Sequence, residues 1–201
     1  MKESKKTIGK ALGLVLVMTL LCGVVYTAVI TFIGNVFFNE KANGSIIEVN
    51  GVNFGSELLA QQFNDEDHMW GRIMNLNLTT YQDEEGNWLM YSGPSNLSPN
   101  GQDLKAQVEE RVKIIQAANP EAAPNQIPVD LVTSSGSGLD PHISAAAAQY
   151  QVPRLAANHN MTEDEVRAII EKCTKHKILG IFGEETVNVL KVNLMLEGIL
   201  P

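Results

Sequence analysis

The strongest constraint on the fold is an N-terminal run that extends from Ala11 to Phe38 without a charged side chain. As an α-helix it would reach about 42 Å, which is longer than the roughly 30 Å hydrocarbon core of a bilayer. A cleavable signal peptide has a shorter apolar stretch followed by a small-x-small cleavage site, which this run lacks. A lipoprotein signal needs a small residue before the cysteine, whereas Leu21 precedes Cys22. We therefore predict one retained transmembrane helix over residues 11–38.

The charges on either side of this run predict its orientation. Four lysines and one glutamate precede it, namely Lys2, Lys5, Lys6, Lys10 and Glu3. Just after it, Glu40 and Lys41 cancel. Because basic flanks stay on the cytoplasmic side of a membrane, we expect residues 1–10 to form a cytoplasmic basic tail. Residues 39–201 would then be an extracytoplasmic accessory domain of a single-pass cell-membrane protein.

Charge and metal-ligating residues narrow the function of this outer domain. The chain has a formal net charge of −8, and its N-terminal tail is basic, so the rest is acidic. That argues against a nucleic-acid-binding surface, and solubility alone accounts for the charge. Cys22 lies in the predicted membrane helix and Cys173 in the outer domain, so no disulfide is expected. The histidines at 68, 142, 159 and 176 show no ligand spacing, and no metal site is predicted.

Beyond the membrane the pattern predicts short strands first. Asn50-Gly51 is a strong hairpin signal, so residues 45–49 and 52–54 are expected to pair. NLNLTTY and NWLMYSG are expected to be extended on either side of an acidic turn at residues 83–86.

Helices are predicted later in the chain. Apolar residues at helical spacing predict a helix over residues 102–118, and Ser144 can cap the run AAAAQYQ that follows it. Pro153 can start or kink the continuation of that run. Thr162 and Glu165 form a capping box for a further helix. Alternation from Val187 onward predicts a strand and a short terminal turn. The fold class expected is α+β, with one N-terminal transmembrane helix followed by a single mixed α/β extracytoplasmic domain.

The segment SSGSGLDPHIS, residues 134–144, concentrates polar and turn-forming side chains. It lacks the Gly-Lys-Ser/Thr ending of a phosphate loop, and its glycines are too close together for a Gly-x-Ser-x-Gly nucleophile elbow. Asp140 and His142 could form an acid/base pair, but Pro141 fixes a turn between them and no nucleophile is evident. A capped turn is favoured over a polar contact surface, and both are favoured over chemistry. The candidate residues are Ser135, Gly136, Ser137, Gly138, Leu139, Asp140, Pro141, His142 and Ser144.

The order of three segments carries a family resemblance. PVDLVTSSGSGLDPHIS at 128–144 is followed by QVPRLA at 151–156 and by VNVLKVNLML at 187–196, all behind one apolar helix. Over essentially the whole chain this resembles the C subunit family of the Kdp potassium-transporting P-type ATPase. The chain departs from the usual family pattern at Ala145, at Met74 and in the loop SNLSPN. Asn96 and Pro99 of that loop are a second candidate contact site.

The resemblance implies a noncatalytic accessory subunit that assembles or stabilises a high-affinity, ATP-driven potassium uptake complex. The implied partners are a channel-like potassium-binding subunit, a P-type ATPase subunit and a small membrane peptide, together with the lipid bilayer. No cofactor is expected to bind directly; ATP and potassium enter through the complex. A catalytic-chaperone role that raises ATP affinity has been proposed for the family. It conflicts with the outward orientation, because ATP is cytoplasmic, and no nucleotide-binding residue is assigned. The alternative is a membrane-anchored extracytoplasmic ligand-binding module or hydrolase.

Overall fold

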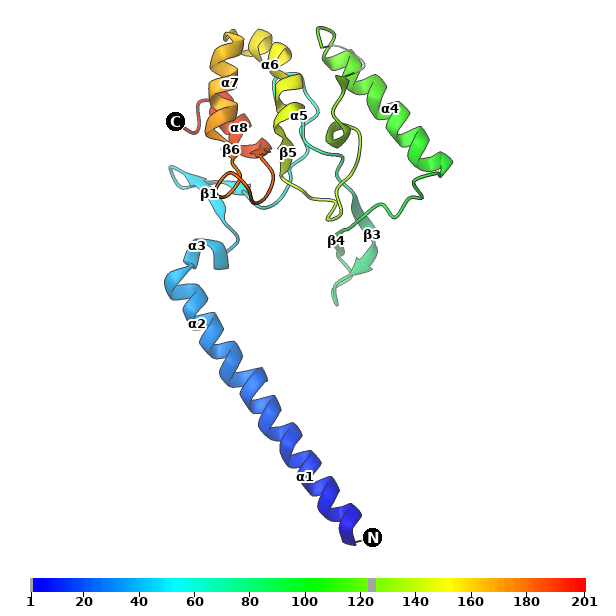
Figure 1. The fold of residues 1–201 in the computed structure, drawn as a ribbon, viewed down its shortest axis with the longest axis vertical. Coiled ribbons are helices and arrows are strands. Elements are labelled where there is room, and N and C mark those ends of the chain that lie inside the picture. Colours follow the sequence, from blue (N-terminus) through cyan, green and yellow to red (C-terminus); the bar gives the residue numbers. More distant parts are fainter. Residues whose placement is uncertain (1, 123–125) are drawn as a thin grey trace. The chain divides into compact units, whose positions relative to one another are not determined.

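The computed structural model describes residues 2–122 and 126–201. The chain divides into two compact units, the first ending at Ile46 and the second running from Ile47 to Pro201. Figure 1 traces both units from the N-terminus to the C-terminus. Helices and strands both occur, which confirms a mixed α and β fold.

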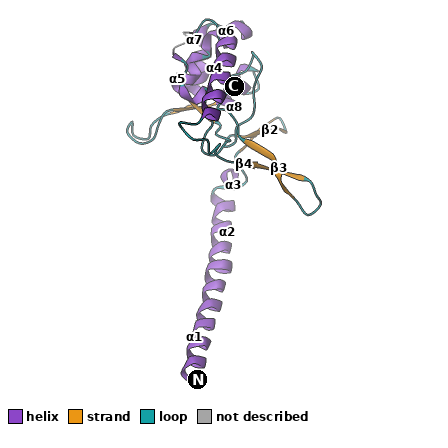
Figure 2. Cartoon of the chain, turned by 90° about the vertical axis from the view of Figure 1, so that its right-hand side faces the viewer, coloured by secondary structure: helices purple, strands orange, loops and turns teal. Residues whose placement is uncertain are grey.

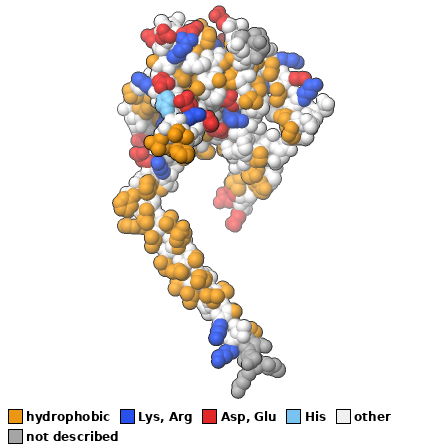
Figure 3. Space-filling model, viewed as in Figure 1, with side chains coloured by type: hydrophobic (Ala, Val, Ile, Leu, Met, Phe, Trp, Pro, Cys, Tyr) orange, Lys and Arg blue, Asp and Glu red, His pale blue; other side chains and the backbone are white. Residues whose placement is uncertain are grey.

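The first unit is dominated by one long apolar helix. Its parts are α1 (Lys2–Met18), a π-helical segment η1 (Thr19–Tyr26), α2 (Thr27–Phe37) and the single turn α3 (Asn39–Ala42). The stretch Lys6–Phe37 is long enough to cross a membrane, and its 18-residue window has a mean hydropathy of 2.4. Apolar side chains cover its surface in Figure 3. The sequence prediction of one long apolar N-terminal helix is therefore confirmed.

The π-helical segment lies in the middle of this helix. Bonds from residue i to i+5 replace the α-helical pattern there and release carbonyl groups that need another donor. The hydroxyl of Thr27 donates to the carbonyl of Cys22 at 3.3 Å. The side chain of Thr27 thus contributes a hydrogen bond to a backbone acceptor within the π-helical segment.

Two hairpins begin the strand-containing part of the chain. β1 (Ile46–Val49) pairs with β2 (Val52–Ser56) across Asn50-Gly51, whose φ angles of 54° and 78° match a type I′ turn. β3 (Leu76–Gln82) pairs antiparallel with β4 (Trp88–Ser92), with an irregularity between Asn77 and Tyr81. Both hairpins predicted from the sequence are confirmed.

A three-stranded antiparallel sheet lies among the helices of the second unit. Its strands are β5 (His142–Ser144), β6 (Thr174–Lys175) and β7 (Thr186–Asn188), with β7 in the centre. The helical segments around it are α4 (Gln102–Ala118), η3 (Val129–Leu131), α5 (Ala145–Tyr150), α6 (Val152–His159), α7 (Glu163–Lys172) and α8 (Val189–Leu196). Figure 2 shows these helices gathered above the β3–β4 hairpin.

The helix ends follow the local sequence signals. α4 has the predicted bounds, and the capping box of Thr162 and Glu165 opens α7. The Ser144 hydroxyl accepts from the backbone N–H of Ala147, so Ser144 caps α5 as predicted. Pro153 lies in the first turn of α6, where its missing N–H is not needed.

The C-terminal prediction was wrong beyond Asn188. The alternating pattern predicted a strand, but Val189–Leu196 is a helix. Asn188 accepts from the N–H of Lys191 and starts that helix. The helix is buried on nearly every face, including Val192 and Asn193. Apolar residues therefore occur at alternating as well as helical spacing, and periodicity alone cannot separate the two structures.

Candidate functional site

The SSGSGLDPHIS motif forms a compact loop between η3 and β5. The hydroxyl of Ser135 accepts from the N–H of Gly138 at 2.9 Å, and that of Ser137 accepts from the N–H of Leu139 at 3.2 Å. The two hydroxyls lie 3.2 Å apart and share a hydrogen bond. Both serines are therefore used to fold the loop itself, which leaves neither one placed as an activated nucleophile.

Gly138 is the position where the motif allows no side chain. Its φ is 71°, and an added Cβ would lie 2.6 Å from the carbonyl oxygen of Gly93 and 2.8 Å from that of Asn75. Asn75 also donates from its backbone N–H to the Gly138 carbonyl at 3.0 Å. The other glycine, Gly136, has no positive φ and open space around it. Of the two glycines predicted as candidates for a positive φ, Gly138 alone has one.

Asp140 and His142 form a turn with Arg72 beside it. The Asp140 carboxylate accepts from the backbone N–H of His142 at 3.0 Å, the bond expected of an Asx turn. Arg72 lies 3.8 Å from the same carboxylate and donates to the Ser134 carbonyl at 3.0 Å. The His142 imidazole lies 3.6 Å from Asp140, beyond hydrogen-bond range. Pro141 accepts through its carbonyl from Val189 and ties the loop to the start of α8.

Asp130 supports Ser144, and sequence reasoning missed it. Its carboxylate is buried and accepts from both the backbone N–H and the hydroxyl of Ser144, at 2.6 and 3.2 Å. The acid comes from η3 and the serine from the end of β5. An aspartate directly after Pro128-Val129 was a visible signal, because such a residue often turns and caps a following segment. The Ser144 hydroxyl is therefore fixed by two hydrogen bonds, one donated to Asp130 and one accepted from the N–H of Ala147.

A shallow cavity of about 510 Å³ opens beside this loop. Asp140, His142 and Ser144 line it together with Arg72 and the carboxylates of Glu184 and Glu185. The motif thus contributes polar side chains to a surface hollow while its serines hold the loop. The geometry offers a polar contact face and no arranged nucleophile and base.

The second candidate loop shapes the path from β4 to α4. Asn96 has a φ of 54°, a left-handed conformation that asparagine tolerates better than most residues. Pro99 lies in the turn in which the N–H of Gly101 donates to the Ser98 carbonyl at 2.8 Å. This loop begins at Gly93, the residue against which Gly138 packs, so the two candidate segments are neighbours at that point.

A buried polar network around Trp70 was missed entirely. Gln151, with no exposed surface, exchanges two hydrogen bonds with the backbone of Trp70, at 2.8 and 3.0 Å. Asn193 does the same with Met69, at 2.7 and 3.1 Å. The two side-chain amides thus bond to the backbone N–H and carbonyl groups of residues 69–70, as the backbone of a neighbouring strand would. Periodicity carried no signal for it, because a glutamine between two helices and an asparagine inside one read as surface residues.

Arg154 is the charged centre of this network. Its guanidinium donates to Asn119 at 3.1 Å, to Gln151 at 2.8 Å and to the carbonyls of His68 and Glu66. It also lies 5.1 Å from the centroid of the Trp70 ring. Burial lowers the pKa of Arg154 to about 10, against the opposite effect of the neighbouring carboxylates. The group stays charged at neutral pH and holds the 65–68 segment in place.

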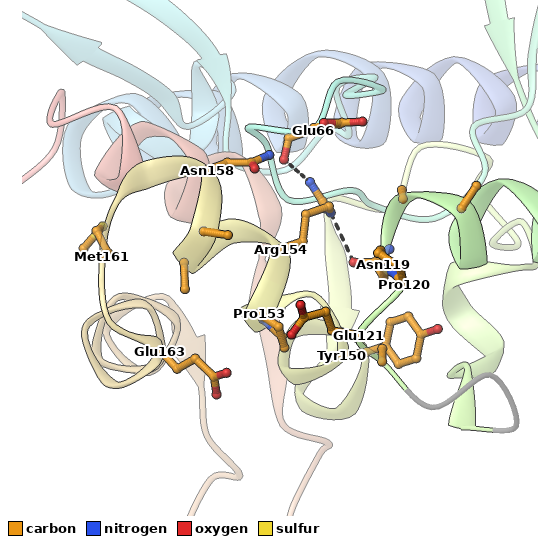
Figure 4. Close-up of a pocket in the computed structure, with 15 residues that line it drawn as sticks. Glu66, Asn119, Pro120, Glu121, Tyr150, Pro153, Arg154, Asn158, Met161 and Glu163 are labelled. Atoms are coloured by element: carbon orange, nitrogen blue, oxygen red, sulfur yellow. Dashed lines mark hydrogen bonds between the residues drawn. The ribbon is translucent and has the colours of Figure 1, made fainter.

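Figure 4 shows the cavity beside Arg154, with a volume of about 350 Å³. Its apolar wall includes Met161 and several alanines, and its rim includes Glu121 and Glu163. The Arg154 donors are already committed, and the Tyr150 hydroxyl is buried without a partner among the residues the structure describes. Across residues 2–122 and 126–201 no three metal-ligating side chains cluster together. Among the described residues that line this cavity, Arg154 is the one cationic side chain, and its guanidinium already donates to Asn119, to Gln151 and to two backbone carbonyls.

Comparison with known proteins identifies the family. The family model described as "KdpC: K+-transporting ATPase, c chain" matches residues 8–198. The chain belongs to this family. A Clostridium botulinum potassium-transporting ATPase KdpC subunit is 56% identical over 200 residues, covering 100% of both chains. The KdpC subunit of Clostridioides difficile is 40% identical over 204 residues, with 97% of this chain and 98% of the relative covered. The KdpC resemblance found in the sequence is confirmed across the whole motif order.

Proposed function

We propose that this chain, as the accessory C subunit of a Kdp potassium-transporting ATPase, stabilises the assembled complex from the outer face of the membrane and catalyses no reaction of its own. The observation that carries the proposal is the use of the motif's polar groups. Ser135, Ser137 and Ser144 all bond within the loop or to Asp130, so they serve the shape of a contact face. A serine hydrolase would need one of these hydroxyls free to attack a substrate and next to a general base.

The membrane helix supports anchorage with the N-terminus inside. Residues 1–10 are then the cytoplasmic basic tail, 11–38 the transmembrane helix and 39–201 the extracytoplasmic accessory domain. The lysines before the helix favour this orientation. An impermeant thiol reagent applied to intact cells should label a Ser95→Cys variant. Labelling that appears only after lysis would overturn the orientation.

Two surfaces of the second unit suit partner subunits. One is the polar hollow beside Asp140 and His142. The other is the β3–β4 hairpin, which exposes large apolar side chains on both faces: Leu78, Tyr81, Trp88, Leu89, Met90 and Tyr91. We assign these surfaces to the channel-like potassium-binding subunit, the P-type ATPase subunit or the small membrane peptide. An exposed apolar patch of this kind marks an interaction site rather than a free surface.

The catalytic-chaperone role proposed for the family receives no support from this arrangement. An outward domain has no access to cytoplasmic ATP, and Arg154, the cation among the described residues that line the 350 Å³ cavity, already donates to protein acceptors. We therefore place ATP and potassium with the other subunits and favour assembly and control of potassium entry. The rival reading of a ligand-binding module or hydrolase predicts activity in the isolated chain.

Reconstituted potassium-stimulated ATP hydrolysis separates these functions. Asp140→Asn and His142→Gln should leave turnover per assembled complex within about threefold of wild type, while complex yield from mild detergent falls. Glu109→Gln, which removes an exposed charge on α4 outside both candidate loops, is the matched control for yield. A loss of turnover of a hundredfold with assembly intact has the size expected of a missing general acid or base and would overturn the noncatalytic function.

A further inference from the structure

The loop between β6 and β7 carries an apolar tip that the described residues of the second unit leave exposed. Leu179 is 84% exposed and Ile181 is 76% exposed, and Ile178 and Phe182 are exposed beside them. No charged residue lies between Ile178 and Gly183. Exposed apolar groups of this size on a loop tip are costly in water and indicate a contact with an apolar surrounding.

The backbone conformation of the tip does not explain why a leucine occupies position 179. Leu179 and Gly180 have φ angles of 56° and 71°, nearly those of Asn50 and Gly51 in the β1–β2 turn. Asparagine adopts this left-handed conformation readily, whereas leucine adopts it at a cost. The β1–β2 turn therefore has asparagine, the favourable residue, at this position, whereas the β6–β7 tip has leucine, which is unfavourable there. Strain of this kind is a reason to look for a functional role of the Leu179 side chain.

The tip also satisfies much of its own backbone. Ile178 donates to the Phe182 carbonyl at 2.8 Å, and Phe182 donates back to the Ile178 carbonyl at 3.0 Å. Gly180 donates to Lys177 at 3.1 Å, and Ile181 donates to Ile178 at 3.2 Å. In a lipid environment each unpaired N–H is expensive, so a loop that pairs them internally is suited to that environment. A loop that docks on a protein has no such need, because the partner's backbone and side chains can pair with it.

Charged and polar pairs surround the base of the tip. Lys177 pairs with Glu184 at 3.4 Å, and the His176 imidazole lies 3.3 Å from Glu185 and 3.1 Å from Glu171. These pairs stand at the level where the apolar residues end. A lysine there can keep its charge in the headgroup region while its stem follows the apolar surface.

We propose that the tip, residues 178–182, inserts into the interfacial layer of the bilayer that holds the membrane helix. The inference rests on the proposed membrane anchorage. The helix ends at Phe37 and the second unit starts at Ile47, and the connecting segment spans at most about 35 Å. The domain is thus tethered beside a lipid surface, and the ordering cost of bringing the tip to that surface is already largely met. Insertion gives the domain a second attachment to the membrane.

The test uses the full chain in lipid vesicles and a polarity-sensitive thiol fluorophore. A Cys22→Ala, Ile181→Cys variant places the label at the tip, and Cys22→Ala, Glu85→Cys places it on the β3–β4 turn as a control. Cys173 stays unlabelled, because it is buried and desolvation raises the pKa of its thiol to about 11. The expected result is a blue-shifted emission and quenching by spin-labelled lipid at residue 181 and neither effect at residue 85.

Label on the native Cys22 tests the anchor separately. Quenching at Cys22 together with a water-exposed label at residue 181 would overturn tip insertion and leave the anchorage standing. No quenching at Cys22 would refute the anchorage and the inference with it. Shielding of residue 181 that appears only when the other subunits are added would assign the tip to a protein partner and would also overturn the inference.

Leu179→Asn gives a second, independent test, read out with the Ile181→Cys label. It puts the residue of the β1–β2 turn into the same conformation, so the variant should fold at least as well as wild type. Its ratio of inserted to free tip should fall about tenfold, the effect of withdrawing one leucine side chain from an apolar surrounding. Leu58→Asn makes the same exchange at another exposed position and should leave the ratio unchanged. Equal ratios for the two variants would contradict the proposal.

Discussion

Replacing Gly138 with alanine should destabilise the second unit strongly. Two effects add at this position. Left-handed backbone costs a non-glycine residue about 1–2 kcal/mol. The new Cβ would stand 2.6 Å from the Gly93 carbonyl oxygen and 2.8 Å from that of Asn75, and both obstacles are backbone atoms that cannot rotate away. Relief of such overpacking costs about 1–3 kcal/mol, so the expected loss is about 2–5 kcal/mol in total.

Thermal unfolding of the full chain in detergent, followed by tryptophan fluorescence, measures this loss. For a domain of 150–250 residues about 1 kcal/mol shifts Tm by about 2–4 °C, so Gly138→Ala should lower Tm by roughly 4–20 °C. Gly136→Ala, two residues away, is the matched control, because Gly136 has open space and no positive φ. Its Tm should stay within about 2 °C of wild type. A Gly138→Ala variant as stable as wild type, or two variants equally destabilised, would refute the packing argument.

Three further changes probe the rest of the second unit by the same unfolding measurement. Burial alone would lower the pKa of His68, but its hydrogen bonds to Glu197 and Asp65 raise it. The stabilisation of the folded state by protonated His68 is therefore present below about pH 6.5 and is lost as the pH rises through the raised pKa. His68→Gln should therefore flatten the fall of Tm with rising pH in this range, and an unchanged slope would contradict it. Ser144→Ala removes a helix cap and should lower stability by about 0.5–2 kcal/mol; no loss would count against the cap. Arg154→Met leaves several buried acceptors unpaired and should cost about 3–5 kcal/mol, whereas a cost below 1 kcal/mol would show that the network is not needed for stability.

Local signals in the sequence predicted those parts of the fold that depend on neighbouring residues. The bounds of α4 followed from apolar spacing and the proline after Asn119, and the β1–β2 turn followed from Asn50-Gly51. The failure at α8 has a physical cause, since a helix buried all around has no polar face to reveal its period.

The interactions that the sequence did not reveal join residues far apart in the chain. Trp70 and Gln151 pair across 81 positions, and Met69 and Asn193 across 124. Spacing along one element carries no information on such pairs. The motif loop was placed correctly as a turn at Gly138, but its support from Asp130 became visible only when η3 and β5 were seen side by side.

The π-helical segment of the first unit affects how the long apolar helix can vary in length. In an α-helix, deleting one residue rotates everything beyond it by about 100° and turns a contact face away from its neighbour. Within Thr19–Tyr26 the backbone hydrogen bonds join residues five apart, one more than in an α-helix. A one-residue deletion there can convert the segment to α-helix and leave α1 and α2 facing as before. Natural variants whose long apolar helix is one residue shorter should therefore carry the deletion within Thr19–Tyr26.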